Sequence, residues 1–158
     1  MAIRNIIKEG DPVLNKVCRP VEKFDGRLAQ LIDDMAETMR EANGVGLAAP
    51  QVGILRRVVV IDVGDDHGLI ELVNPEFVEQ SGEQECTEGC LSSPGQYGIT
   101  KRPAKVKVRA FNRKGEVVEV EGEGLLATAC CHEIDHLNGI LFKSHVIRML
   151  DPKEFDGE

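Results

Sequence analysis

The sequence predicts an α+β fold with mostly antiparallel β-sheets packed around a central helix that carries an HExxH pattern, plus an N-terminal helix. Two segments have the periodicity of amphipathic helices, and they flank a long central region of short alternating or β-branched segments. Consecutive strands between helices are typical of an α+β architecture. With 158 residues, of which 42% are hydrophobic and 29% charged, the chain is expected to form one catalytic domain over 1–158.

Composition and charge argue against several classes of function. The net charge is −8 and there is no basic run, whereas stable nucleic-acid binding needs clustered Lys and Arg. No apolar run approaches the ~20 residues of a membrane span, and no signal peptide is visible. The cysteines are odd in number, and two are adjacent, which does not indicate a disulfide framework: Cys18, Cys86, Cys90, Cys130 and Cys131. We therefore expect a cytoplasmic protein without a membrane partner.

The N-terminal third is predicted to contain two helices and a loop. Asp11, followed by proline, resembles an N-cap that opens a short helix up to about residue 17. A longer helix is expected over 25–43, where Asp25 can cap it and a core-facing stripe follows: Leu28, Leu31, Ile32, Met35 and Met39. The segment 44–51, GVGLAAPQ, contains two glycines and is expected to be a loop that another chain can approach closely.

The central region is predicted to form strands. Residues 57–63 are apolar and β-branched, as in a buried strand, and 69–79 resembles another. A Ser-Gly turn leads into a third over 83–89, after which the small residues up to 95 are expected to leave regular structure. Residues 105–111 and 117–121 alternate in polarity with opposite charges, which predicts a hairpin with cross-strand charge pairs on its solvent face.

The second strong helix is predicted over 124–137, ended by an Asn-Gly pair, and it carries HEIDH at 132–136. Two histidines four residues apart lie about 40° apart around the axis and about 6 Å apart along it, so both can bind one ion. Neutral imidazole is the commonest metal ligand in proteins. Glu133, next to the first histidine, stands where a general base for a metal-activated water is needed.

A catalytic site of this kind usually has a third protein ligand and an open position. One longer form of the pattern, HExxHxxGxxH, fails because its last position is Phe142. Another form takes a downstream glutamate, but Glu154 and Glu158 lie in a tail without helical periodicity. Cys90 is the upstream candidate, since a thiolate binds iron or zinc strongly and Cys90 follows a predicted strand.

Two alternatives remain open on residue chemistry alone. Cys86 and Cys90 could join the histidines in a closed structural zinc site, although the two thiols would lie about 13 Å apart on an extended strand and Glu133 would have no role. The HExxH pattern alone also fits another metallohydrolase, such as a small peptidase. Cys130 and Cys131 are expected to be core thiols, because the helical spacing turns Cys131 away from the metal.

Three motifs together are more specific than HExxH alone: GVGLAAPQ at 44–51, EGCLS at 88–92 and HEIDH at 132–136. In this order and spacing they resemble the peptide deformylases, and the resemblance covers nearly the whole chain. Because the sequence ends at Glu158, it is similar to the shorter bacterial class, without the longer C-terminal helix of many members. Cys131 stands where the family commonly has glutamine, and we expect activity to survive this difference.

The resemblance implies hydrolysis of the N-formyl group from the N-terminal formyl-methionine of nascent peptides, with release of formate. The partners are then N-formylmethionyl nascent peptides and, transiently, the ribosome. The family's ligands correspond to Cys90, His132 and His136, which would hold one Fe²⁺ per chain, with Zn²⁺, Ni²⁺ or Co²⁺ as substitutes. Glu88, Arg102 and Asp135 are expected either to support these ligands or to be ordinary surface charges.

The resemblance also implies the catalytic roles. A metal-bound water attacks, Glu133 acts as general base and then acid, and the Gln51 amide and the Leu91 N–H stabilise the oxyanion. On the predicted helix, small or apolar residues precede His132 and would form the wall of a pocket for a linear apolar side chain such as methionine. The expected substrate-binding residues are Gly44, Val45, Gly46, Leu125, Thr128 and Ala129.

Overall fold

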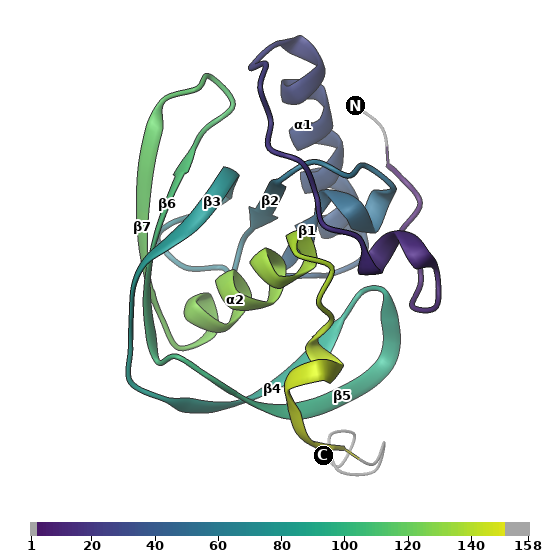
Figure 1. The fold of residues 1–158 in the computed structure, drawn as a ribbon, viewed down its shortest axis with the longest axis vertical. Coiled ribbons are helices and arrows are strands. Elements are labelled where there is room, and N and C mark those ends of the chain that lie inside the picture. The colour runs from purple at the N-terminus through teal and green to yellow at the C-terminus, as the bar shows by residue number, and fades with distance from the viewer. Residues whose placement is uncertain (1–2, 151–158) are drawn as a thin grey trace.

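The computed structural model describes residues 3–150, and Figure 1 shows how their elements are arranged. These residues contain two α-helices, α1 (Gly26–Glu41) and α2 (Leu125–Leu137), and three 3₁₀ helices, η1 (Pro12–Asn15), η2 (Ala49–Val52) and η3 (Phe142–His145). The strands are β1 (Gly46–Ala48), β2 (Val58–Ile61), β3 (Ile70–Ser81), β4 (Gln84–Cys90), β5 (Ser93–Arg102), β6 (Lys105–Phe111), β7 (Val117–Glu123) and β8 (Val146–Met149).

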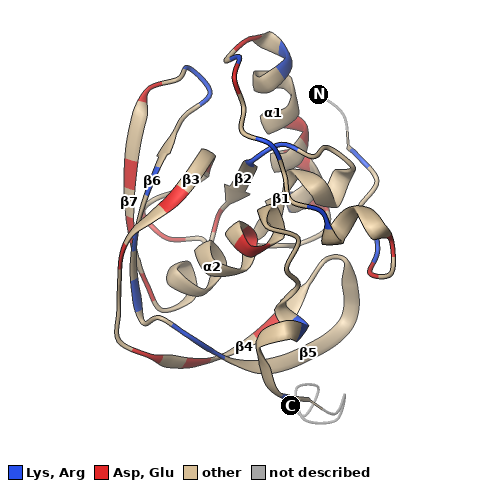
Figure 2. Cartoon of the chain, viewed as in Figure 1, with Lys and Arg blue, Asp and Glu red and all other residues tan. Residues whose placement is uncertain are grey.

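The strands form two sheets in which every pairing of named strands is antiparallel. A five-stranded sheet has the order β1-β2-β3-β6-β7, and a three-stranded sheet has the order β4-β5-β8. The predicted hairpin is β6–β7, where Arg109 faces Glu119 in the register and bonds to it at 2.8 Å. Figure 2 shows basic segments on β6 and acidic segments on β7. The predicted α+β class with mostly antiparallel sheets is confirmed.

Helix α2 is the central element, and it lies between the two sheets (Figure 1). Most of its residues are buried, and Ala127, Cys130 and Ile134 belong to the apolar core that the large sheet covers. The helix ends where Gly139 takes a φ of 74°, a left-handed conformation that glycine adopts without strain, as the Asn-Gly pair predicts. Because α2 is buried on nearly all sides, its polar side chains must find partners inside the protein.

Helix α1 covers the other face of the large sheet. Asp25 caps it by accepting hydrogen bonds from the N–H groups of residues 27 and 28, both at 3.2 Å. The predicted apolar stripe, which includes Met35 and Met39, is buried against Val58 and Val60 of β2. These methionines are therefore core residues. Neither α-helix of the described residues is long and apolar enough to cross a membrane.

Several predicted boundaries are wrong. The segment after residue 89 was expected to leave regular structure, yet β4 continues to Cys90 and β5 begins at Ser93. The predicted loop 44–51 contains β1 and η2, and the first short helix is a 3₁₀ turn that ends at Asn15. The polar β5 lacks an alternating apolar pattern, so only its pairing with β4 and β8 makes it a strand.

Candidate active site

The HEIDH segment places two imidazoles on one side of α2. The ring centroids of His132 and His136 are 5.0 Å apart, and both side chains are buried. The Sγ of Cys90, at the end of β4, lies 3.4 Å from His136 Nε2, and the ligand atoms of the three residues are all within 4.8 Å of one another. Phe142, where the longer HExxH pattern has a ligand, stacks on His132 instead, with centroids 5.8 Å apart.

The chemistry of these three residues fits a divalent transition metal. Burial lowers the pKa of His136 to about 3, which keeps its imidazole neutral and able to act as a ligand. His132 Nδ1 lies 2.8 Å from the Glu88 carboxylate, to which it donates, so its Nε2 is left for an ion. In the metal-free protein burial lowers the pKa of His132, but the charge of Glu133 and hydrogen bonds at the ring outweigh burial and raise this pKa well above its usual value. A bound divalent ion would displace that proton. One thiolate and two deprotonated imidazoles would then form a donor set that suits Fe²⁺ or Zn²⁺.

The buried Glu88 and Arg102 and the partly buried Asp135 form a network behind His132 and are not ordinary surface charges. Arg102 donates to Glu88 at 2.6 and 2.9 Å and to Asp135 at 2.9 Å, and Thr100 also donates to Glu88. Burial raises the pKa of Glu88, but hydrogen bonds from Arg102, His132 and Thr100 outweigh it and hold the pKa at about 2. The ionised carboxylate then fixes the orientation of the His132 ring.

Glu133 is buried beside the three candidate ligands. Its Oε2 lies 4.0 Å from His132 Nε2, and its Oε1 has no hydrogen-bond partner among the described residues. Burial raises its pKa to about 7, opposed by the charge of His132 and supported by the charges of Glu88 and Asp135. A carboxyl group with a pKa near neutrality and an unpartnered oxygen is suited to exchanging protons with a bound molecule.

Gly46 lies against this carboxylate, and adding a methyl group there is expected to impair catalysis. A Cβ at position 46 would stand 2.6 Å from Glu133 Oε2 and 2.8 Å from its Cγ, so the buried carboxylate would have to move. A displacement of about 1 Å can cost about 100-fold in rate. Gly46→Ala is therefore expected to lower kcat/KM, for the formyl peptide that the motif resemblance implies as substrate, by about that factor with one equivalent of metal still bound. Gly26→Ala is the matched control, because a Cβ there meets open space; less than a threefold loss in Gly46→Ala would contradict the expectation.

Gln51 reaches the site from η2. Its Oε1 accepts from the Ala48 N–H at 3.0 Å, and its Nε2 donates to Ser92 Oγ at 3.1 Å and lies 3.5 Å from Cys90 Sγ. Ser92 therefore sets the rotation of the Gln51 amide. Sequence reasoning missed this role, although Ser92 closes the EGCLS motif, because the contact spans 41 residues.

A cavity of about 560 Å³ opens beside these residues. The structure brings every predicted substrate-binding residue to its wall, namely Gly44, Val45, Gly46, Leu125, Thr128 and Ala129, together with Gln51, Cys90, Leu91, His132 and Glu133. Val45 and Leu125 are exposed at the mouth. Further lining residues were not anticipated from the sequence: Ile6, Lys8, Thr87, Gly89, Pro94 and Tyr97.

The other cysteines lie outside this ligand group. Cys86 Sγ is 2.9 Å from Thr128 Oγ1, so the structure does not bring the two thiols of the closed-zinc alternative together on one ion. Cys130 and Cys131 are buried, as predicted, and burial raises the pKa of Cys130 to about 12 and that of Cys131 to about 11. Such thiols are unreactive core groups. Glu154 and Glu158, weighed as ligands, lie outside the described residues.

Comparison with known proteins agrees with this arrangement. The model of the polypeptide deformylase family matches residues 3–151. The chain belongs to the peptide deformylase family. It is 62% identical over 156 residues to a peptide deformylase of Acetivibrio thermocellus, covering 99% of this chain and 91% of that protein. It is 59% identical over 157 residues to that of Caldanaerobacter subterraneus subsp. tengcongensis, covering 99% and 98%.

Solved peptide deformylases have the same fold. The crystal structure of the enzyme from Legionella pneumophila has a TM-score of 0.88 at 51% identity and covers 91% of this chain and 86% of that one. The structure from Thermotoga maritima has a TM-score of 0.88 at 45% identity and covers 91% and 97%. Peptide deformylases are metal-dependent hydrolases that act on nascent peptides, so this chain is an enzyme of that class.

Proposed function

We propose that this chain hydrolyses the N-formyl group of N-terminal formyl-methionine, releasing formate, with one Fe²⁺ held by Cys90, His132 and His136. The observation that carries the proposal is the group of three ligand atoms within 4.8 Å of one another, of which Cys90 and His132 line the same cavity as Glu133. Zn²⁺, Ni²⁺ and Co²⁺ suit the same donors and are expected as substitutes. When bound, such an ion supplies Lewis acidity, which lowers the pKa of water and polarises a carbonyl group.

Glu133 is proposed to move the proton. Its unpartnered Oε1 can accept a proton from the water that attacks the formyl carbon. The same carboxyl group then delivers that proton to the departing amine, so a free N-terminus and formate leave together. The buried position of Glu133 excludes bulk water from the transfer, and burial raises the pKa of this carboxyl group, which favours its acceptance of a proton.

The Gln51 amide and the Leu91 N–H are proposed to stabilise the developing oxyanion. The Gln51 Nε2 group donates to Ser92 Oγ at 3.1 Å and to Cys90 Sγ at 3.5 Å, which places the amide beside the candidate metal ligand. Leu91 follows Cys90 directly, so its backbone N–H is carried by the turn that positions the thiolate. Each preorganised donor of this type is worth about 3 to 4 kcal/mol in the transition state.

The substrate is proposed to bind as an extended strand. β1 is an edge strand of the large sheet and β4 an edge strand of the small sheet, and residues from both line the cavity. A peptide backbone between them can therefore pair with either edge. Leu125, Thr128 and Ala129 would receive the methionine side chain. The natural substrates would be N-formylmethionyl nascent peptides, met in the cytoplasm during transient contact with the ribosome.

The direct test is formate release from a formyl-Met-Ala-Ser peptide by the anaerobically purified, iron-loaded enzyme. We expect turnover with iron, loss after chelation, and recovery when Fe²⁺ is returned. Cleavage of internal bonds in unformylated peptides, without formate release, would instead identify a peptidase. The absence of formate with one equivalent of bound iron would refute the proposal.

A further inference from the structure

The turn between β4 and β5 carries both Cys90 and the Leu91 N–H. Cys90 faces Ser93 in the register, and Gly89 faces Tyr97, so Leu91 and Ser92 form a two-residue turn and residues 94–96 bulge out of the ladder. Such a turn has few ladder hydrogen bonds of its own. Its position must depend on contacts with the rest of the protein.

Glu9 holds this turn from its outer side. The Glu9 N–H donates to the Ser92 carbonyl oxygen at 2.8 Å, and Ser93 Oγ donates to the Glu9 carboxylate at 3.2 Å. One residue of the N-terminal segment therefore binds the last residue of the turn through its backbone and the first residue of β5 through its side chain. The second of these bonds spans 84 residues of sequence.

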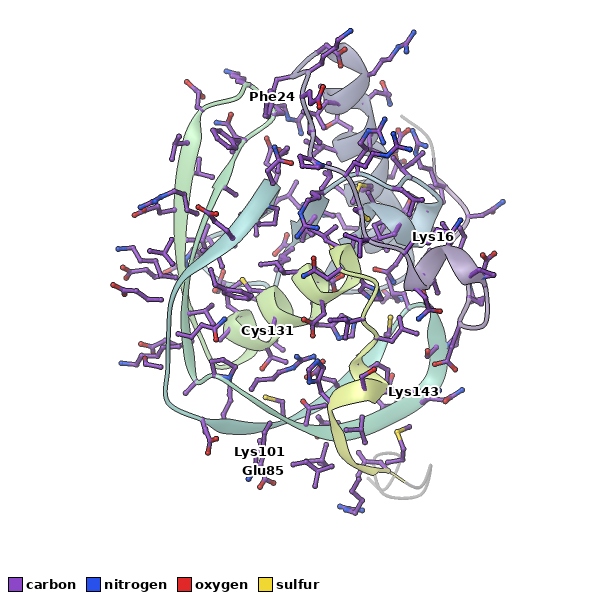
Figure 3. The ribbon with its side chains drawn as sticks, in the orientation of Figure 1. Lys16, Phe24, Glu85, Lys101, Cys131 and Lys143 are labelled. Atoms are coloured by element: carbon purple, nitrogen blue, oxygen red, sulfur yellow. The ribbon has the colours of Figure 1, made fainter. Side chains whose placement is uncertain are left out.

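Lys143 holds the Glu9 side chain in place. Its Nζ lies 2.7 Å from Glu9 Oε1 and also donates to Gln96 Oε1 in the bulge. Figure 3 shows Lys143 on the η3 segment, next to β5. Both charged side chains are about one-third exposed, so solvent screens the pair only partly. The Glu9–Lys143 clamp, defined by these two residues, thus joins the N-terminal segment, η3 and the bulge.

The inner side of the same turn touches the candidate oxyanion donors. Ser92 Oγ accepts from the Gln51 amide at 3.1 Å. The side chain of Leu91 packs over Gly44, where an added Cβ would lie 2.7 Å from Leu91 Cδ1. A shift of the turn would therefore move the Leu91 N–H and release the Gln51 amide together.

We propose that Glu9 and Lys143 are positioning residues that hold the Leu91 N–H and the Gln51 amide where the oxyanion forms. The inference rests on the proposed deformylase function. Stabilisation of charge that exists only in the transition state affects kcat more than KM. The clamp is therefore expected to act on kcat, without a contact of its own to the substrate or the metal.

Three variants test the clamp: Lys143→Met, Glu9→Gln, and the charge swap Glu9→Lys with Lys143→Glu. Each single variant is expected to lower kcat about threefold to tenfold, with KM within about twofold of wild type. The swap is expected to restore kcat only in part, because the ion pair returns but position 9 no longer offers Ser93 Oγ a carboxylate. Lys101→Met is the matched control, because Lys101 lies on β5 but points away from the site, as Figure 3 shows, and it should leave kcat unchanged.

Hydrogen–deuterium exchange supplies a readout that needs no turnover. The peptide spanning 90–97 should exchange faster in both single variants and recover in part in the swap. Single variants with wild-type kcat would overturn the proposal, as would a swap no better than either single change. Loss of bound metal in place of kcat would also overturn it, because the clamp would then act on Cys90. A wild-type enzyme that releases no formate refutes the function, whereas unchanged exchange refutes the clamp.

Discussion

Replacement of Glu133 by alanine is expected to lower kcat by about 10²- to 10⁴-fold while one equivalent of metal stays bound. The residue is not among the three candidate ligands, and its carboxylate is the buried group best placed to accept a proton. The variant would be loaded with iron and assayed for formate, with metal content measured on the same sample. Glu85→Ala, on the outer face of the small sheet, serves as the control (Figure 3). Retained activity in Glu133→Ala would exclude the proposed proton transfer.

The pH dependence of kcat/KM also tests the role of Glu133. Its pKa is raised to about 7 by burial, and the positive charge of a bound ion will lower it, so the acid limb of kcat/KM is expected below pH 7. In the metal-free protein, the contribution of Glu133 to stability changes with pH in the direction opposite to that of most acidic groups. The protonated form favours the fold, so this contribution is present below about pH 4.5 and is lost as the pH rises through about 7.

Replacement of Arg102 by methionine is expected to lower the free energy of unfolding by about 3 to 5 kcal/mol. The guanidinium is 5% exposed and donates to both Glu88 and Asp135, so its removal leaves a buried carboxylate without its charged partner. The His132 ring would then be held less firmly as well, and the metal affinity is expected to fall about 10- to 100-fold. Urea unfolding of the metal-free proteins and a metal titration measure the two effects.

Arg109→Met is the control for this variant, because Arg109 pairs with Glu119 at the surface and its loss should leave the urea midpoint near wild type. The pH dependence offers a further check. The Glu88 pKa is lowered to about 2, so in the wild type its contribution to stability is present above about pH 4.5 and is lost as the pH falls toward 2. A wild-type unfolding energy in Arg102→Met would show that the pair contributes no net stability.

Much of the fold could be predicted because its signals are local. The spacing of Leu28, Met35 and Met39 predicted α1 and its buried face, and the opposite charges of 105–111 and 117–121 predicted the β6–β7 hairpin. β5 and β8 were missed, because neither has an alternating apolar pattern. β5 is a strand through its pairing with β4 across a two-residue turn and with β8, and β8 is a strand only through its pairing with β5, a distant segment of the chain.

The geometry of HEIDH follows from local sequence, because the α-helical repeat places His132, Glu133 and His136 relative to one another whatever surrounds them. The three ordered motifs indicated the family on the same local basis. The surroundings of that helix depend instead on contacts between distant parts of the chain. The fold brings Cys90 to 3.4 Å from His136 across 46 residues, buries Glu88 with Arg102, and joins Glu9 to Lys143 across 134 residues. These contacts arise from sheet pairing and desolvation, which act between distant segments and leave no periodic pattern in the sequence.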